Sequence, residues 1–336
     1  MRGVNWCTVW VVMLLLAGCS SLPDIRDDRS QVSLDGQILL KRARQLSMQN
    51  KADLALREAT RAYENFTLSD DLSGRVLAGL DIARFNRKLG KPEDAKAWAE
   101  KSHRLVRVFV PSLMPNWQLL KAEFFFAEAQ YDSVLRYTQI SRTSEEQDET
   151  VAHLFAYRLM AGLQVSSYDA DALKHDTEAL EKIVPRLEEK FEEYTLTDPF
   201  VLSFAEYALG YAAIKQQAWE RAARSFEKAL AIDRQFGNFR ATADNLYGLG
   251  IASDRREQPE QARGYFERAH DIYYSMGDTL AAQRATFKIL VIKLESNEHQ
   301  EQVIKELEQL YLQVHDERLK QEIDRILHPK EPASKE

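Results

Sequence analysis

The sequence predicts an all-helical protein, organised as an α-solenoid of about six to seven helical hairpins. The clearest sign is a repeat between residues 204 and 278, where one pattern occurs twice at an offset of forty residues. Apolar residues in the rest of the chain recur at helical spacing, and most of the 13 glycines stand at predicted joints between helices. The alternative is an ordinary helical bundle with a chance pattern of Ala and Leu. Because six or seven positions coincide at one offset, we favour the repeat.

The matched positions of this repeat lie in both helices of each hairpin. They are Leu209-Gly210 with Leu249-Gly250, Ala222 with Ala262, Phe226 with Phe266, Ala229 with Ala269, and Gly237-Asn238 with Gly277-Asp278. Small residues beside a large one allow facing helices to interdigitate. One hairpin cannot bury its apolar face alone, so about three or more must stack. The pattern resembles the tetratricopeptide repeat, in a variant of roughly 40 residues with a longer joint. This resemblance implies a right-handed solenoid that binds other proteins.

The first twenty residues carry a second motif, which bears on the location of the protein. Arg2 precedes a short apolar run over residues 9–16, about the length expected of a cleaved signal peptide. Leu16-Ala17-Gly18-Cys19 follows and is similar to the lipobox of bacterial lipoproteins. The resemblance implies a signal peptide over residues 1–18 and a Cys19 that carries a diacylglycerol and an acylated amino terminus. Ser20 next to it implies the outer membrane, with the protein facing the periplasm. The alternative is a plain signal peptide with an incidental cysteine.

Cysteine usage and charge limit the function further. Cys7 lies in the segment predicted to be removed and Cys19 carries the lipid, so the mature chain is expected to have neither a free thiol nor a disulfide. No other apolar segment approaches the length of a membrane span. Lys and Arg total 45 against 52 Asp and Glu, with a pI of about 5.7 and no dense basic run. This composition argues against nucleic-acid binding.

Between the lipid site and the repeat, the chain is predicted to form a tether and a first lobe. Residues 19–34 are polar and charged and are expected to be the tether. Residues 35–194 are expected to be an N-terminal lobe of degenerate hairpins, in which Ala95 follows Ala55 at the same offset of forty. Near its end, the charged helical stretch over residues 169–194 is expected to break or kink at Pro185. Thr195–Pro199 is the clearest internal boundary, because it combines turn residues with a helix start.

The second lobe is predicted over residues 195–328 and contains the two clear repeats followed by a capping hairpin. In this cap the apolar pattern continues over residues 280–294, whereas Gln302 and Glu306 occupy the places of Ala262 and Phe266. A polar outer face of this kind is needed at the end of a solenoid. A short helix over residues 317–327 completes the cap. Residues 329–336, with two prolines and several charges in residues 328–336, are expected to be a disordered tail.

The sequence contains no catalytic or metal-binding motif, so we predict that the protein is not an enzyme and has no cofactor or metal site. Gly248 and Gly250 form a Gly-x-Gly, but it lies inside a predicted helix with no strand before it, so no phosphate site is expected. Acidic pairs such as Glu145-Glu146 are common on solvated helices. The histidines stand at no metal-ligand spacing with another His, Cys or Glu. They are His103, His153, His175, His270, His299, His315 and His328.

The candidate site is a binding groove. In tetratricopeptide arrays the first helices of the hairpins line a concave surface, and their exposed side chains select the ligand. By that resemblance, the groove residues are Tyr207, Tyr211 and Ile214 in one repeat and Tyr247, Ile251 and Asp254 in the next. Tyrosines suit an interface because they bury a large area at low entropic cost. The alternative is that they pack between neighbouring helices. Of the three aromatics at 124–126, at least one is expected to leave the core of its own hairpin and to contact the adjacent unit or a partner.

We therefore predict an outer-membrane-anchored scaffold or adaptor that faces the periplasm and presents its groove to protein or peptide partners of a cell-envelope complex. The main alternative is a ligand-sensing lipoprotein that holds a solute or a peptidoglycan fragment between its lobes, near Thr195–Pro199. A third alternative is self-association through an exposed end hairpin.

Overall fold

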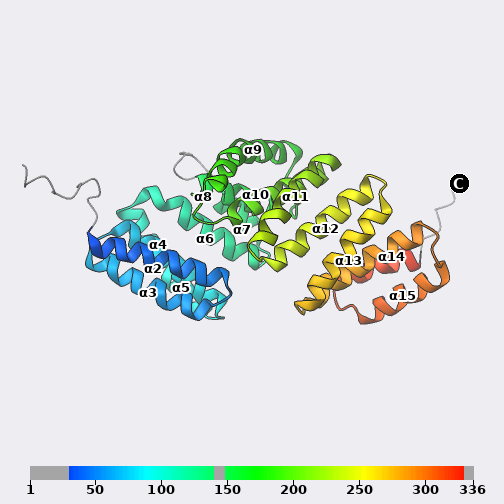
Figure 1. The fold of residues 1–336 in the computed structure, drawn as a ribbon, viewed down its shortest axis with the longest axis horizontal. Helices are drawn as coiled ribbons and strands as arrows, with labels where there is room; N and C mark the ends of the chain where they lie inside the picture. Colours follow the sequence, from blue (N-terminus) through cyan, green and yellow to red (C-terminus); the bar gives the residue numbers. More distant parts are fainter. Residues whose placement is uncertain (1–29, 140–147, 329–336) are drawn as a thin grey trace, which may run out of the picture. The chain divides into compact units, whose positions relative to one another are not determined.

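The computed structural model describes residues 30–139 and 148–328, and within these ranges the chain consists of fifteen α-helices, one short 3₁₀-helix and no β-strand (Figure 1). The predicted all-helical solenoid is confirmed as the fold class. The chain divides into two compact units, residues 1–117 and 118–336. The predicted signal peptide, Cys19 and the tail 329–336 lie outside the described residues, as does the acidic pair Glu145-Glu146.

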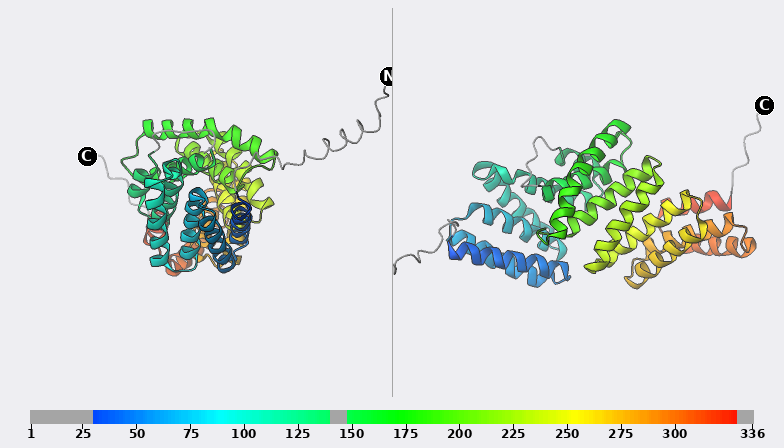
Figure 2. Two further views of the ribbon diagram at one scale, coloured as in Figure 1. Left: turned by 90° about the vertical axis from the view of Figure 1, so that its left-hand side faces the viewer. Right: turned by 45° about the horizontal axis from the view of Figure 1, so that its top comes forward.

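The first unit is a stack of two helical hairpins. Helices α2 to α5 run side by side and alternate in direction (Figures 1 and 2). They are α2 (Gln31–Met48), α3 (Ala52–Leu68), α4 (Leu72–Lys88) and α5 (Pro92–Val108), followed by the 3₁₀-helix η1 (Pro111–Leu113). The Phe66 ring is buried between two glycines, because a Cβ on Gly36 or Gly74 would stand 2.9 or 2.3 Å from it. These glycines allow α2 and α4 to approach the same ring.

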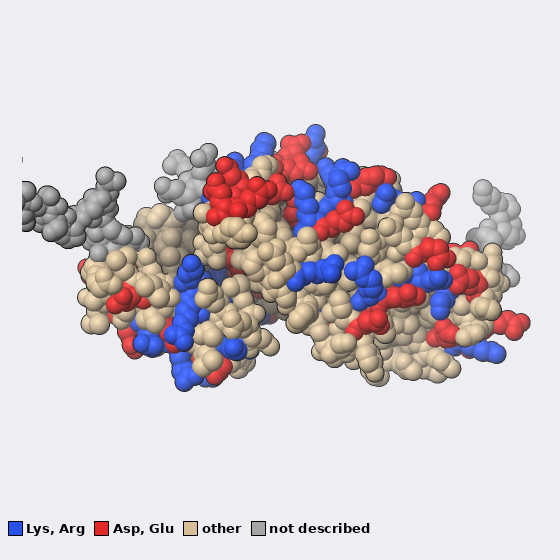
Figure 3. Space-filling view, viewed as in Figure 1, with Lys and Arg blue, Asp and Glu red and all other residues tan. Residues whose placement is uncertain are grey.

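The second unit continues the same alternation. Helix α6 (Met114–Ala127) begins just before the division and ends in this unit. It is followed by α7 (Tyr131–Tyr137), α8 (Asp148–Gly162), α9 (Ala170–Glu192), α10 (Phe200–Lys215), α11 (Trp219–Gln235), α12 (Phe239–Arg255), α13 (Pro259–Ser275), α14 (Thr279–Glu295), α15 (Gln300–Gln313) and α16 (Glu317–Leu327). Lys, Arg, Asp and Glu are interspersed on the face of this unit that Figure 3 presents, as expected of solvated helices.

The joints between helices follow local turn and capping rules. Gly90, Gly237 and Gly277 have φ of +70°, +70° and +76°, the left-handed region that glycine enters without strain. Pro92 stands at the first turn of α5, where its missing N–H costs no hydrogen bond. Asp278 caps α14 by accepting a hydrogen bond from the backbone N–H of Ala281. The other glycines of the described residues lie inside helices, so the expectation that most glycines stand at joints is wrong.

Two predicted boundaries differ from the structure. Helix α2 begins at Gln31, inside the stretch predicted as tether, because Ser30 caps it and the Ser33 hydroxyl donates to Asp71 at 2.7 Å. The predicted lobe boundary at Thr195–Pro199 is only a turn. Buried residues of α8, α9 and α10 form one continuous core across it, and the division of the chain falls after Trp117 instead.

Two further differences concern local packing. Helix α9 continues through Pro185, so the predicted break is absent. Leu180, Val184 and Leu187 are buried on both sides of the proline and hold the helix in the core. In the cap, Gln302 is exposed as predicted. The buried positions of α15 are Val303, Leu307 and Leu310, and the first two lie one residue after the places of Ala262 and Phe266. The capping hairpin therefore keeps an apolar core with a shifted register.

Candidate functional site

The six residues predicted to line a groove lie on the first helices of two adjacent hairpins. Tyr207, Tyr211 and Ile214 are on α10, and Tyr247, Ile251 and Asp254 hold the matching places on α12. Spacings of four and three residues put each trio on one face of its helix. All six side chains are half-buried, so each keeps part of its surface open to solvent.

The tyrosines of this set also pack against the second helices. The ring centroids of Tyr207 and Tyr211 are 5.0 Å apart, and Tyr211 stands edge-on to Phe226 of α11 at 5.2 Å. Tyr247 makes the equivalent contact with Phe266 of α13 at 5.1 Å. Edge-to-face pairs at these distances are a favoured arrangement of aromatic rings. The tyrosines thus contribute to packing, as the alternative interpretation anticipated, and binding along this face stays a prediction.

Glycines set the spacing of the helices beneath these tyrosines. The Phe226 ring is fully buried and lies between two of them, since a Cβ on Gly210 or on Gly248 would stand 2.7 or 2.6 Å from it. A Cβ on Gly250 would stand 2.6 Å from the Phe266 ring. Small residues at 210 and 250 were predicted for close helix approach, and this prediction is confirmed. Gly248 serves the neighbouring hairpin, so the Gly-x-Gly is a packing feature inside α12.

Aromatic contacts continue from α10 towards the start of the unit. Phe204 is 6.4 Å from Tyr207 and 4.8 Å from Tyr157 of α8. Tyr157 is in turn 5.4 Å from Phe126 of α6. Phe126 therefore contacts the adjacent hairpin, as predicted for at least one of the three aromatics at 124–126, and it also keeps a contact with Tyr131 of its own hairpin at 5.7 Å. Rings of three successive first helices form one row.

The phenols on this face remain neutral. Burial raises the pKa of Tyr207 well above its usual value and that of Tyr247 to about 12. Burial likewise raises the pKa of Asp244, whose carboxylate accepts a 2.7 Å hydrogen bond from the Tyr273 hydroxyl and pairs with Arg240. The face thus combines aromatic rings with one paired carboxylate, a composition suited to binding a polypeptide segment.

A buried polar centre fixes α10, α11 and α12 to one another. The Asp233 carboxylate has no exposed surface and accepts hydrogen bonds from Ser203 Oγ (2.5 Å), Asn245 Nδ2 (2.8 Å) and Asn238 Nδ2 (3.0 Å). Burial raises the pKa of Asp233 to about 6, although these donors oppose the rise. Sequence reasoning missed this centre. The four residues share no motif. Forty residues on, the positions that match Ser203, Asp233, Asn238 and Asn245 are Ala243, Tyr273, Asp278 and Ala285.

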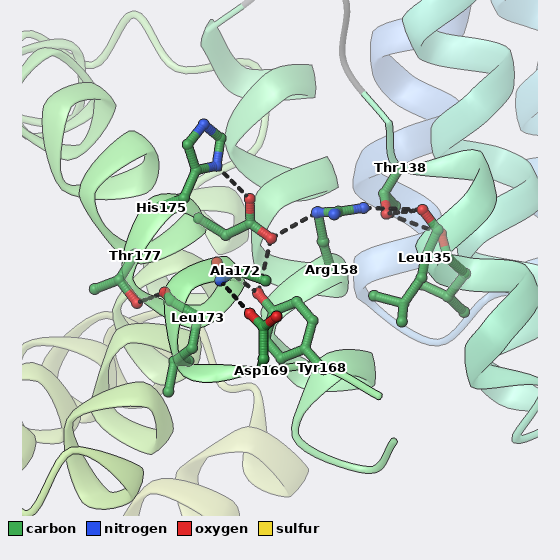
Figure 4. Close-up of polar contacts among 11 residues, drawn as sticks. Leu135, Thr138, Arg158, Tyr168, Asp169, Ala172, Leu173, His175 and Thr177 are labelled. Carbon is green, nitrogen blue, oxygen red and sulfur yellow. Dashed lines mark hydrogen bonds and ion pairs between the residues drawn. The ribbon is translucent and has the colours of Figure 1, made fainter. Parts of the chain in front are cut away.

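A second polar centre lies at the start of α9 (Figure 4). Asp176 is buried and accepts hydrogen bonds from Arg158 Nε (2.5 Å) and the Tyr168 hydroxyl (2.7 Å), with His175 Nδ1 at 2.9 Å. Arg158 also donates to the backbone oxygen of Leu135 at 2.9 Å. The cluster joins α7, α8 and α9. Burial and the hydrogen bond to Asp176 raise the pKa of Tyr168. The Tyr168 hydroxyl therefore stays protonated and donates this hydrogen bond.

An open cleft of about 540 Å³ lies next to this centre, between α9, the end of α10 and the start of α11. Tyr168 and Leu173 give it an apolar wall, and Lys174, Lys215 and Arg221 bring positive charge. Arg221 pairs with Glu181 at 3.2 Å. None of residues 195–199 lines this cleft. The cleft therefore does not lie at the position predicted for a small-molecule site.

Neither metal chemistry nor a membrane span emerges from the described residues. Over residues 30–139 and 148–328, no group of three or more His, Cys, Asp or Glu is arranged to hold a metal ion. The same part of the chain has no helix long and apolar enough to cross a bilayer.

Fold and site together define a helical-repeat protein whose first helices carry matched side chains. Residues 202–275, which correspond to α10–α13, match the family model of the tetratricopeptide repeat. This match confirms the resemblance inferred from the forty-residue pattern.

Two solved structures have a similar fold. The crystal structure of the apo form of RapI gives a TM-score of 0.56 at 13% identity, covering 87% of this chain and 81% of that chain. The crystal structure of a Rap protein complexed with competence and sporulation factor gives 0.52 at 14% identity, covering 88% of this chain and 81% of that one. At these identities the likeness is one of fold alone. No curated protein matches the chain.

Proposed function

We propose that the chain is a lipid-anchored scaffold of the outer membrane that faces the periplasm and binds a protein or peptide partner along α10 and α12. The observation that carries this proposal is the pair of matched faces, Tyr207/Tyr211/Ile214 and Tyr247/Ile251/Asp254, in the segment that matches the tetratricopeptide repeat. Repeat solenoids use such extended surfaces to bind partners. A Rap protein of similar fold is complexed with competence and sporulation factor, which supports a partner-binding role for the fold.

The membrane part of the proposal rests on the N-terminal sequence. The apolar run over residues 9–16 followed by Leu16-Ala17-Gly18-Cys19 has the order expected of a lipoprotein signal. Two or more acyl chains on one residue give stable anchoring, because each buried CH₂ contributes about 0.8 kcal/mol. The partner would then be a component of a cell-envelope complex.

Site-specific photo-crosslinking in intact cells tests the binding face. A benzophenone amino acid replaces Ile214 or Asp254, which lie at the ends of the two trios and are partly exposed. Matched controls carry it at Glu227 or Glu267, exposed positions forty residues apart on the second helices. We expect the same protein to be crosslinked from 214 and 254 and not from the controls, and mass spectrometry identifies it.

Other outcomes separate the parts of the proposal. Equal crosslinking from all four positions would refute the face while leaving a scaffold role. An absence of crosslinks from 214 and 254 in cells that contain the lipidated protein would refute partner binding by α10 and α12.

A ligand-sensing role is the second candidate, and the 540 Å³ cleft favours it. Lys174 and Lys215 line the cleft without a carboxylate partner among the described residues, and Asp169, Glu178 and Glu181 line it too. A small ligand that carries both charges, such as a peptidoglycan fragment, therefore suits it. Thermal unfolding with and without such fragments tests this role. Stabilisation that disappears in Lys174→Ala/Lys215→Ala would support it, and an unchanged melting temperature would remove it.

A further inference from the structure

Exposed apolar side chains are concentrated at one kind of helix end. Fourteen large hydrophobic residues are exposed among the described residues. Eleven of them lie within two residues of the end of a second helix or the start of a first helix, and only Met48 lies at the opposite kind of joint. Singly scattered exposed hydrophobics are ordinary, whereas a concentration at one edge marks an interaction surface.

In the first unit these residues form an apolar edge, which consists of Val32, Leu68, Val108 and Phe109. Leu68, Val108 and Phe109 are 81%, 61% and 62% exposed. Because α2 to α5 alternate in direction, the start of α2, the α3–α4 joint and the end of α5 lie at the same end of the stack (Figure 1). The Ser33–Asp71 hydrogen bond at 2.7 Å joins the first two of these segments directly.

The opposite edge of the same unit has a different chemistry. It contains the α2–α3 and α4–α5 joints, and Lys51, Lys88 and Lys91 stand there with exposed side chains. Lys88 Nζ donates to Ser47 Oγ at 2.8 Å, which brings the ends of α2 and α4 together. We call this the basic edge after its three lysines, which stand beside the exposed Asp53, Glu93 and Asp94. The two edges of one small unit therefore offer two surfaces, one apolar and one charged.

The chain before Ser30 indicates what covers the apolar edge. Ten residues join Cys19 to Ser30, so the lipid site lies at most about 40 Å from the start of α2. The chain enters the unit at the apolar edge, because α2 begins there at Gln31 beside Val32. The basic edge lies further away by the length of α2, about 27 Å for its 18 residues. The segment from Cys19 therefore enters the unit at the apolar edge, and contact of this edge with the bilayer needs none of the extra reach that the basic edge would need.

We propose that the apolar edge contacts the surface of the membrane in which Cys19 is anchored, with Leu68, Val108 and Phe109 among the lipid headgroups. Insertion of apolar side chains at the boundary between headgroups and acyl chains is favourable. A lipid anchor also keeps these side chains at a high local concentration near the bilayer. This inference rests on the proposed lipid anchor. The inference adds the orientation of the first unit to the proposed anchor, because the basic edge of this unit then points away from the membrane.

Fluorescent labels at single cysteines test the contact. Since Cys19 is expected to be blocked by lipid and Cys7 to be removed, an introduced cysteine takes the label alone. The full lipidated chain carries Leu68→Cys or Phe109→Cys on the apolar edge, and Met48→Cys or Lys91→Cys on the opposite edge as matched controls. Each cysteine carries the environment-sensitive fluorophore NBD. Its emission is measured with the chain bound to vesicles of phosphatidylethanolamine and phosphatidylglycerol that contain nitroxide-labelled lipid.

We expect labels at 68 and 109 to shift to the blue and to be quenched by the nitroxide, in low and in high salt, and labels at 48 and 91 to do neither. A label at Val108→Cys in a Leu68→Glu/Phe109→Glu background is expected to lose its quenching, because two charged side chains oppose insertion. These edge residues are exposed, so the charged variant keeps the fold, and its unfolding curve checks this.

Sedimentation with the vesicles separates the two proposals. If the chain does not sediment or mass spectrometry finds Cys19 unmodified, the anchor itself fails. If the chain sediments and the labels at 68 and 109 behave like those at 48 and 91, the apolar edge does not contact lipid. If labels at 68 and 109 are shielded in cells but not on vesicles, the edge binds a protein, and the lipid proposal is overturned.

Discussion

Replacing Gly248 by alanine tests the packing on which the two clear repeats depend. Gly248 lies in α12 and approaches the Phe226 ring of the neighbouring hairpin, where an added Cβ would stand 2.6 Å from ring atom Cζ. The ring has little space to move, because it is fully buried and a Cβ added at Gly210 would also stand 2.7 Å from it. The methyl group therefore has no space unless α10 or α12 moves.

The size of the effect follows from two opposing contributions. Overpacking a well-packed core costs about 1–3 kcal/mol, and the depth of this overlap places it in the upper part of that range. Alanine in place of a helical glycine returns about 1 kcal/mol. We expect Gly248→Ala to lower the free energy of unfolding by about 2 kcal/mol, as measured by urea unfolding of the chain with Cys19→Ser.

Gly264 supplies the matched control, because it also lies inside a helix, α13, and an added Cβ there meets no atom within 4 Å. We expect Gly264→Ala to raise the free energy of unfolding by about 0.5–1 kcal/mol. A Phe226→Leu substitution combined with Gly248→Ala should cost less than the sum of the two single changes. If Gly248→Ala proves as stable as the unchanged chain, the reasoning about the Phe226 ring is wrong.

Three other predictions concern charge and anchoring. Because burial raises the pKa of Asp233 to about 6, its contribution to stability is present below about pH 4 and lost as the pH rises through about 6. Against Asp233→Asn, the unchanged chain should therefore gain on the order of 2 kcal/mol as the pH falls from about 7.5 to 4.5, measured by urea unfolding. Asp81→Asn should cost about 2 kcal/mol at neutral pH, because Arg44 and Arg84 lose the carboxylate they contact at 2.6 and 2.8 Å. Cys19→Ser should move the protein from the membrane fraction to the soluble fraction and abolish incorporation of labelled palmitate.

Each of these changes has a control within the chain. A stability difference between Asp233→Asn and the unchanged chain that is constant with pH would contradict the assigned titration. Asp53 is exposed, so Asp53→Asn should change the free energy of unfolding by less than about 0.5 kcal/mol. If Asp81→Asn changes it no more than Asp53→Asn does, the argument that the buried ion pairs of Asp81 stabilise the fold is wrong. Cys7→Ser should leave the location unchanged, and retention of Cys19→Ser at the membrane would refute the lipid site.

The repeats were predictable because their signals are local. Leu209-Gly210 and Phe226, matched forty residues later by Leu249-Gly250 and Phe266, indicated paired helices in close contact. The structure confirms both contacts. Gly248 was interpretable only as a residue inside a helix, because the ring it meets belongs to the preceding hairpin. The sequence pattern of one repeat does not predict which side chain of a neighbouring hairpin packs against a glycine such as Gly248.

The lobe boundary illustrates the same limit. Thr195–Pro199 has the composition of a turn, and the chain does turn there. Whether a turn also separates two compact units depends on the core around it, and α8, α9 and α10 share one core across this turn. The division after Trp117 lies just inside α6, two residues after Pro115, where the two prolines at 111 and 115 predict a joint between hairpins but not a boundary between units.

The candidate site stays a prediction. The resemblance to the tetratricopeptide repeat assigned Tyr207, Tyr211 and Tyr247 to a binding face of the first helices, and the structure describes how these side chains pack. Their half-burial and their contacts with Phe226 and Phe266 required coordinates, since the same spacing suits an exposed face and a packed one.

The sequence by itself determined the helical class, the forty-residue repeat, the positions of most joints and the lipoprotein-like N-terminal motif, because each depends on neighbours along the chain. Only the tertiary structure decided how the cores join, how far each tyrosine is buried and what surrounds Asp233. Ser203 and Asn245 lie 30 and 12 residues from that carboxylate, and they meet it only because three helices pack together. Burial, and the pKa shift that it causes, is a property of this packing and has no local signal in the sequence.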